Sequence, residues 1–80
     1  MSNLQMLTQE EVATMLHAHV TTITTLREVG VLPAIKTGKN FMFSQESLRK
    51  FQQDYAGYDV SNRVKAIEAY NSVNKLQGGY

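Results

Sequence analysis

The stretch VTTITTLREVGVLP, residues 20–33, constrains the fold more than any other part of this 80-residue chain. Its threonines and valines favour a strand by propensity, because β-branched side chains lose χ1 freedom in a helix. Strict alternation, however, gives two faces that each mix polar and apolar residues. Helical spacing brings Ile23 and Leu26 together and leaves a polar face behind them. The stretch therefore predicts a helix over Val20–Val29, ended by the glycine and the proline that follow it.

The segment LTQEEVATMLHA, which precedes this helix, has the pattern of a helix start. Thr8 can cap the first turn, and Glu11 stands at the reciprocal position three residues later. Apolar residues then follow at i, i+3 and i+4, which gives the segment one apolar face. These features predict a helix over residues 9–17 and a short turn between it and the helix at Val20.

Residues 34–44, AIKTGKNFMFS, predict a two-stranded β-hairpin. Ile35 lies on one side of the turn-forming residues TGKN, and Phe41 and Phe43 lie on the other. Because a two-stranded hairpin is only marginally stable alone, we expect these three apolar side chains to bury against the helices.

Two more helices are expected after the hairpin. The first begins with a cap at Ser44 and ends near Gly57, with Leu48, Phe51 and Tyr55 turned inward. The second is amphipathic and ends at Gly78; we expect its first half to pack on the domain and its second half to protrude. The residues expected on its inner face are Val60, Val64, Ile67, Tyr70, Val73 and Leu76.

Composition limits the chain to one small soluble domain, mainly α with a small β-hairpin. Apolar residues make up 42% of the sequence and charged residues 19%, and the net charge is +1, which is typical of a globular chain. Residues 31–50 hold four basic residues and one acidic residue, a surplus of three positive charges around the hairpin. This is the only marked asymmetry of charge, and it indicates a weakly basic patch.

Catalysis and metal binding are not supported by the residue pattern. His17 and His19 are two residues apart, so they do not share a helix face, and there is no cysteine to complete a zinc site. No Ser/His/Asp set, glycine-rich phosphate loop or pair of carboxylates stands out. We therefore expect no enzyme activity, no metal and no cofactor. The amino-terminal residues lack a signal-peptide pattern and no apolar run is long enough to span a bilayer, so a cytoplasmic protein is expected.

The order of these motifs resembles a known family of DNA-binding domains. Residues 7–52 resemble the small winged helix-turn-helix domains of phage and plasmid excisionases, which are related to MerR-type domains. The resemblance rests on LTQEEVATML, LREVGVLPAIKTGKNFMF and SQESLRKF, which follow one another at the family's spacing. It implies a winged helix-turn-helix domain over residues 1–56 and a carboxy-terminal helix and tail over residues 57–80, used for packing, oligomerisation or partner contact.

The resemblance also implies a site on double-stranded DNA. The second helix would enter the major groove, and the hairpin would press on the backbone or on an adjacent minor groove. By position in the family pattern, base reading is implied for Val20, Thr21, Thr24 and Thr25. Contact with the DNA backbone is implied for Thr8, Gln9, Lys36, Gly38, Lys39 and Asn40.

Several positions depart from the family pattern towards less positive charge. Excisionases commonly carry arginine where this chain has Val20, Thr25 and Glu28, and a basic residue near Asn40 or Met42. Fewer cations neutralise fewer phosphates, which lowers sequence-independent affinity. We therefore expect one copy to bind DNA weakly and to need self-association on adjacent sites, or help from a recombinase (integrase) or another phage protein.

The function expected from the sequence is non-catalytic, sequence-specific DNA binding. The protein would be an excisionase-like architectural factor that directs recombination, or a small transcriptional regulator. Two alternatives stay open at this stage. One is an antirepressor-like protein-interaction module that keeps the winged fold without DNA affinity. The other is the DNA-recognition domain of a small terminase subunit, which resembles the same fold.

Overall fold

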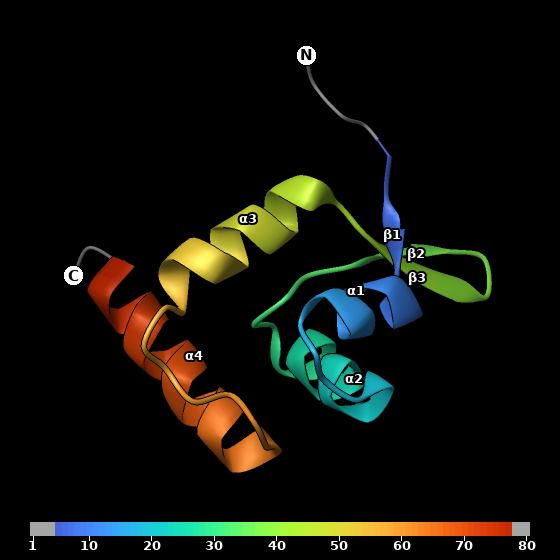
Figure 1. The fold of residues 1–80 in the computed structure, drawn as a ribbon. Helices are drawn as coiled ribbons and strands as arrows, with labels where there is room; N and C mark the ends of the chain where they lie inside the picture. The colour runs from blue at the N-terminus through green and yellow to red at the C-terminus, as the bar shows by residue number, and fades with distance from the viewer. Residues whose placement is uncertain (1–4, 78–80) are drawn as a thin grey trace.

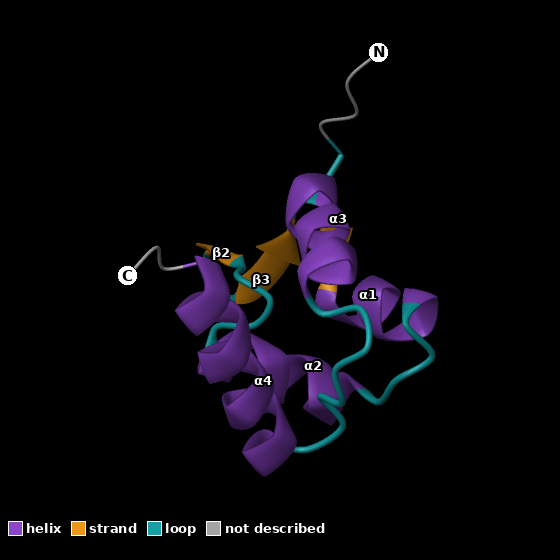
Figure 2. Ribbon diagram, turned by 90° about the vertical axis from the view of Figure 1, so that its left-hand side faces the viewer, coloured by secondary structure: helices purple, strands orange, loops and turns teal. Residues whose placement is uncertain are grey.

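The structure, a computed structural model, describes residues 5–77 and confirms a mainly α fold with a small antiparallel sheet (Figures 1 and 2). Its elements in chain order are β1 (Leu7–Thr8), α1 (Gln9–Met15), α2 (Val20–Val29), β2 (Ile35–Thr37), β3 (Asn40–Phe43), α3 (Gln45–Asp54) and α4 (Arg63–Gln77). The hairpin of β2 and β3 and the long helix α4 lie at opposite ends of the molecule in Figure 1. The three shorter helices occupy the space between them.

Helix α1 begins as predicted and ends earlier than predicted. The Thr8 side chain accepts a hydrogen bond from the Glu11 N–H, and the Glu11 carboxylate accepts one from the Thr8 N–H, so the capping box is present. The helix stops at Met15 because His17 adopts a left-handed conformation, with φ +54°. The Ala18 N–H then donates to the Ala13 carbonyl at 2.9 Å, which closes the helix and turns the chain towards α2.

Helix α2 has the predicted bounds, Val20–Val29. Ile23 and Leu26 are fully buried, and Gly30 ends the helix in the left-handed region with φ +104°. His19 stands at its amino-terminal cap without a side-chain hydrogen bond to the helix. The threonine-rich stretch is therefore a helix because its apolar residues follow the helical period, although its intrinsic propensity is poor.

The sheet has three strands, where the sequence predicted two. Strand β3 is central in the order β1-β3-β2, and β1 pairs with it in antiparallel register, Leu7 opposite Phe43. The cap residue Thr8 is extended, with φ −75° and ψ 164°, so the residues that start α1 can also pair with the hairpin. The turn at the hairpin tip places Gly38 at φ +73°, the sign that a two-residue turn of type II′ requires at its first central position.

The prediction that Ile35 is buried is wrong. Its side chain is 55% exposed, whereas Phe43 is fully buried and Phe41 is half-buried. Ile35 pairs with Met42 across the hairpin, and Met42 lies between the two phenylalanines. Because successive strand residues point to opposite faces, this register turns Ile35 away from the face that carries Phe43 and the core.

Helix α3 follows the prediction closely. Ser44 caps it by accepting a hydrogen bond from the Ser47 N–H at 3.0 Å, and Leu48 and Tyr55 are buried. The helix ends at Asp54, and Gly57 takes φ +89° in the loop that leads to α4.

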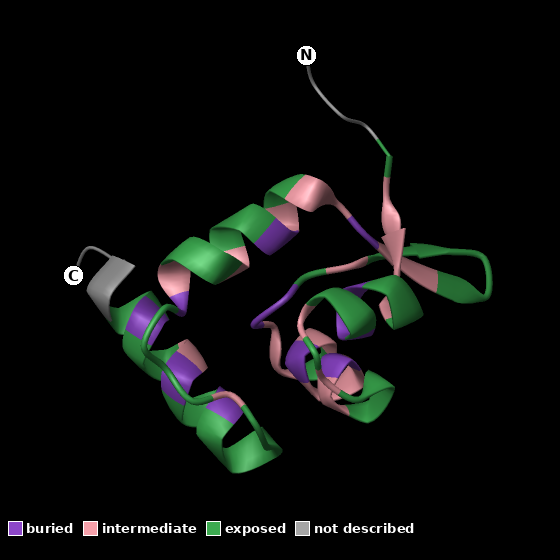
Figure 3. Ribbon diagram, in the orientation of Figure 1, coloured by how far each residue is buried: buried purple, intermediate pink, exposed green. Residues whose placement is uncertain are grey.

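Helix α4 buries only part of the expected face: Val73 is buried and Tyr70 packs against the core, as predicted. Ala66, Ala69 and Val73 are buried, whereas Val64 is 66% exposed and Ile67 is 42% exposed. Small side chains on the inner face allow α4 to approach α2 closely, and this close packing decides which face is buried. Burial of Val73 also contradicts the expectation that the second half protrudes; Figure 3 shows buried positions along much of α4. The predicted end at Gly78 and the side chain of Leu76 lie outside the described residues.

Gly30 should be the glycine least tolerant of a side chain. A Cβ added there meets Tyr70 Cε1 at 3.2 Å, whereas a Cβ at Gly57 meets nothing within 4 Å, and both residues have positive φ. We expect Gly57→Ala to lower the free energy of unfolding by about 1 kcal/mol through backbone strain alone. Gly30→Ala should cost more, because Tyr70 must also move. Urea unfolding of both variants measures the difference, and equal losses would contradict the close contact with Tyr70.

Candidate nucleic-acid interface

The outward face of α2 carries the side chains for which the sequence predicts base reading. Helical geometry places Thr21, Thr24 and Glu28 at i, i+3 and i+7, opposite the buried Ile23 and Leu26. Val20 is 40% exposed, and Thr21 is exposed. Among the described residues, the Thr21 hydroxyl makes no hydrogen bond, so the first turn of α2 presents an uncommitted hydroxyl beside exposed methyl groups.

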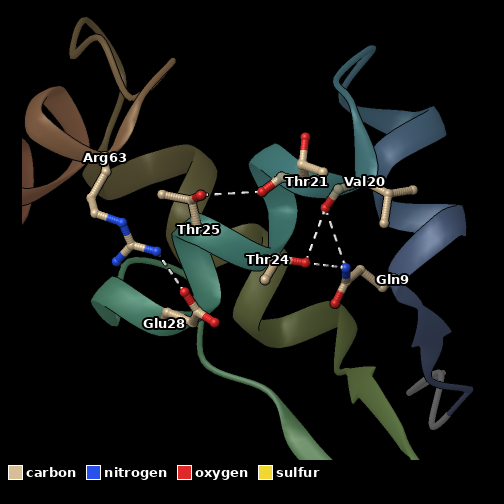
Figure 4. Close-up of polar contacts among 7 residues, drawn as sticks. All are labelled: Gln9, Val20, Thr21, Thr24, Thr25, Glu28 and Arg63. Carbon is tan, nitrogen blue, oxygen red and sulfur yellow. Dashed lines mark hydrogen bonds and ion pairs between the residues drawn. The ribbon is translucent and has the colours of Figure 1, made fainter.

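Thr24 and Gln9, by contrast, are bound to one another. The Gln9 Nε2 donates to the Thr24 Oγ1 at 2.6 Å and to the Val20 carbonyl at 3.2 Å. The Thr24 hydroxyl in turn donates to the Val20 carbonyl at 3.3 Å (Figure 4). These bonds join the first turn of α1 to the first turns of α2, so they orient the two helices relative to each other.

Thr25 also directs its hydroxyl into its own helix. Its Oγ1 donates to the Thr21 carbonyl at 3.1 Å, and the residue is half-buried. Of the three threonines predicted to read bases, only Thr21 therefore keeps its hydroxyl free for an external partner.

The residues predicted to contact the backbone from the hairpin are all exposed. Lys36 lies on β2, Gly38 and Lys39 form the tip, and Asn40 begins β3. A polar groove separates this hairpin from the start of α1. Its lining residues are Thr8, Gln9, Glu10, Lys39, Asn40 and Phe41. The fold thus brings four predicted backbone-contact residues, two from α1's start and two from the hairpin, to one groove.

An arginine on α2 holds the hairpin through an aromatic ring. The guanidinium carbon of Arg27 lies 3.7 Å from the centroid of the Phe41 ring, a cation–π contact. Lys36, the cross-strand partner of Phe41, places its Nζ 6.0 Å from the same centroid. The sequence did not predict this cation–π contact, although it showed an arginine near the end of α2 and an aromatic residue in the hairpin. Only the packing of α2 against the hairpin brings them together.

The basic surplus of residues 31–50 is divided between two parts of the fold. Lys36 and Lys39 lie on the hairpin, whereas Arg49 and Lys50 lie on α3. Lys50 forms an ion pair with Asp54 at 3.0 Å. The predicted basic patch at the hairpin is therefore smaller than the sequence count indicated.

At the other end of α2, Glu28 is bound to α4. Its Oε1 accepts a hydrogen bond from the Arg63 Nη2 at 2.6 Å, and the two side chains are 45% and 54% exposed. Sequence analysis did not find this pair, because the residues are 35 positions apart and no local pattern links them.

Two groups among the described residues have shifted pKa values, and neither lies on α2 or the hairpin. Burial raises the pKa of the Tyr55 phenol. Hydrogen bonds from the Ser61 hydroxyl and the Ser61 N–H lower the pKa of the Asp59 carboxyl, in the loop before α4. Over residues 5–77 no three His, Cys, Asp or Glu side chains gather as metal ligands. No helix in that range is long and apolar enough to cross a membrane.

Comparison with known proteins identifies the part of the chain that carries this surface. A family model described as a helix-turn-helix domain matches residues 6–55, which is more than half of the chain. The match covers β1 to α3 and stops before α4. No curated protein and no solved structure matches the chain.

The bond between Gln9 and Thr24 should be measurable as a coupling energy. Thr24→Val keeps the side-chain shape and removes the hydroxyl, and Gln9→Ala removes the donor. Because the hydrogen bond is partly buried, we expect a coupling of about 0.5–1.5 kcal/mol in the free energy of unfolding. A double-mutant cycle by urea unfolding measures it. Strictly additive losses would mean that the two side chains do not act together.

Proposed function

Because the chain belongs to the excisionase-like family of helix-turn-helix DNA-binding domains, we propose that it reads double-stranded DNA with α2 in the major groove and the hairpin on the phosphate backbone. The helix-turn-helix is a sequence-specific DNA-binding unit, and its family is typically non-catalytic. The observation that carries this proposal is the exposed first turn of α2 beside a hairpin whose two lysines are also exposed.

Base reading is assigned mainly to the first turn of α2. The free hydroxyl of Thr21 can donate to or accept from a base edge, and the Val20 methyl groups can pack on a thymine methyl. The hydroxyls of Thr24 and Thr25 are engaged within the protein, so their contribution is assigned to apolar contact and to the shape of the helix surface.

Contact with the backbone is assigned to the hairpin and to the start of α1. Lys36 and Lys39 supply positive charge, the Gly38 N–H and the Asn40 amide supply donors, and Thr8 lies across the groove from them. Gln9 lines the same groove, but its Nε2 bonds to Thr24 and Val20. Its role is therefore to hold α1 and α2 in the orientation that presents this surface.

The small number of cations supports a cooperative mode of action. Lys36 and Lys39 are the two lysines on the hairpin, and Glu28 places an acid on the outward face of α2. A surface that neutralises few phosphates gains little sequence-independent affinity. We infer that several copies bind adjacent sites, in the manner of an architectural factor for recombination or of a small transcriptional regulator. A recombinase is the partner that the first of these roles requires.

Replacing the hairpin lysines and replacing Thr21 should change DNA binding in different ways. Affinity is measured against a duplex selected from a random pool and against unselected duplexes, at several salt concentrations. Lys36→Ala with Lys39→Ala should weaken binding to all duplexes alike and reduce the salt slope by about two. Thr21→Ala should instead change which sequence is selected.

The matched control is Lys50→Ala with Lys75→Ala, which removes the same charge from α3 and α4. It should leave both the affinity and the salt slope near those of the unchanged protein, since neither lysine lies on α2 or the hairpin. The Lys50 side chain is 67% exposed, although that of its partner Asp54 is only 18% exposed, so urea unfolding checks that the control variant is folded. No binding to any duplex at low salt would contradict the proposed function and would favour a protein-interaction module.

A further inference from the structure

The outward face of α2 carries an acid where the proposed function requires contact with a polyanion. Glu28 shares this face with Thr21 and Thr24, because the three residues are spaced at i, i+3 and i+7. An uncompensated carboxylate at the end of a groove-reading helix would repel the nearby phosphates. The structure shows how this charge is compensated.

Arg63, the first residue of α4, reaches across to Glu28. Its Nη2 donates to the Glu28 Oε1 at 2.6 Å, and Figure 4 shows the guanidinium group beside the surface of α2 that carries Thr25. A guanidinium group has five N–H donors, and one of them is used here. Because the arginine side chain is 54% exposed, the other donors can reach a partner outside the protein.

The packing of α4 keeps Arg63 at this position. Ala66 and Ala69 are buried one and two turns further along the helix, and the Tyr70 ring lies against Gly30. The Asn62 Oδ1 caps the helix by accepting a hydrogen bond from the Lys65 N–H at 2.9 Å. The backbone of the first turn of α4 is therefore placed beside the carboxy-terminal half of α2.

Stability alone is a weak reason for the ion pair. Both side chains are about half exposed, and ion pairs of this kind contribute little to folding because solvent and salt screen them. A carboxylate that orients a guanidinium group while most of its donors stay free is instead suited to binding a second anion.

We propose that Arg63 contacts a DNA phosphate at the carboxy-terminal end of α2, with Glu28 as the residue that positions it. The DNA-binding surface then extends beyond residues 6–55 onto α4. This inference rests on the proposed function, since it assumes that the outward face of α2 meets DNA.

The test compares four variants with the unchanged protein on one selected duplex and one unselected duplex, at 50 and 200 mM salt. Arg63→Gln removes the charge, and Arg63→Lys keeps it. Glu28→Gln removes the negative charge and keeps an oxygen that can accept the hydrogen bond from Arg63. Lys65→Gln is the matched control, because Lys65 lies in the same turn of α4 but lines a different surface with Asp59 and Glu68. Urea unfolding of each variant confirms that it is folded.

We expect Arg63→Gln to weaken binding to both duplexes and to reduce the salt slope by about one, the contribution of one phosphate. The ratio of its Kd to that of the unchanged protein should rise about threefold when salt is lowered from 200 to 50 mM. Arg63→Lys should keep the slope, and Lys65→Gln should not change it. Glu28→Gln should bind at least as tightly as the unchanged protein, because a repelling charge is gone while the amide oxygen of the new side chain can still accept the hydrogen bond that positions Arg63.

Two outcomes would overturn the inference while leaving the proposed function intact. One is an unchanged salt slope for Arg63→Gln. The other is equal weakening by Arg63→Gln and Glu28→Gln, which would mean that the pair serves only to hold α4 on α2. If the unchanged protein binds neither duplex at 50 mM salt, the proposed function fails and this inference fails with it.

Discussion

The left-handed end of α2 at Gly30 is the constraint on which most of the structure depends. The Gly30 and Leu32 N–H groups both donate to the Leu26 carbonyl, at 3.1 and 3.2 Å. These bonds end the helix and turn the chain so that Val31 and Leu32 enter the core. The missing side chain at Gly30 also lets Tyr70 of α4 lie close to this turn. Gly30 therefore ends α2, turns the chain towards the hairpin and leaves room for α4 to pack closely against this turn.

Much of the polar surface of α2 is used to hold the fold together. Thr24 is bound to Gln9 of α1, Arg27 lies over Phe41 of the hairpin, and Glu28 is bound to Arg63 of α4. Each contact joins α2 to a different neighbour, so these three side chains are already engaged within the protein. Few polar side chains of α2 therefore remain available for contacts outside the protein, and these lie mainly in its first turn.

The features that could be predicted from the sequence are those that depend on nearby residues. The capping box of Thr8, the bounds of α2, the cap at Ser44 and the turn at Gly38 all follow from residues within a few positions of one another. Besides the earlier end of α1 and the third strand of the sheet, the predictions that were wrong concern which face is buried. Ile35 is exposed, and α4 buries alanines in place of Val64 and Ile67, because strand register and the closeness of helix packing decide which face is inside.

The sequence by itself determined the order of the elements, the helical period of a threonine-rich stretch and the positions of its stops, since these depend on local backbone geometry and on hydrophobic spacing. Apart from the local bond of Thr25 to the Thr21 carbonyl, tertiary structure decided which of the predicted contact residues stay free. The pairing of Leu7 and Thr8 with β3, the bond between Gln9 and Thr24 and the ion pair of Arg63 each join segments distant in the chain. Hydrogen-bonding capacity is a property of each residue, but whether a neighbour already uses it depends on where the fold brings the two groups together.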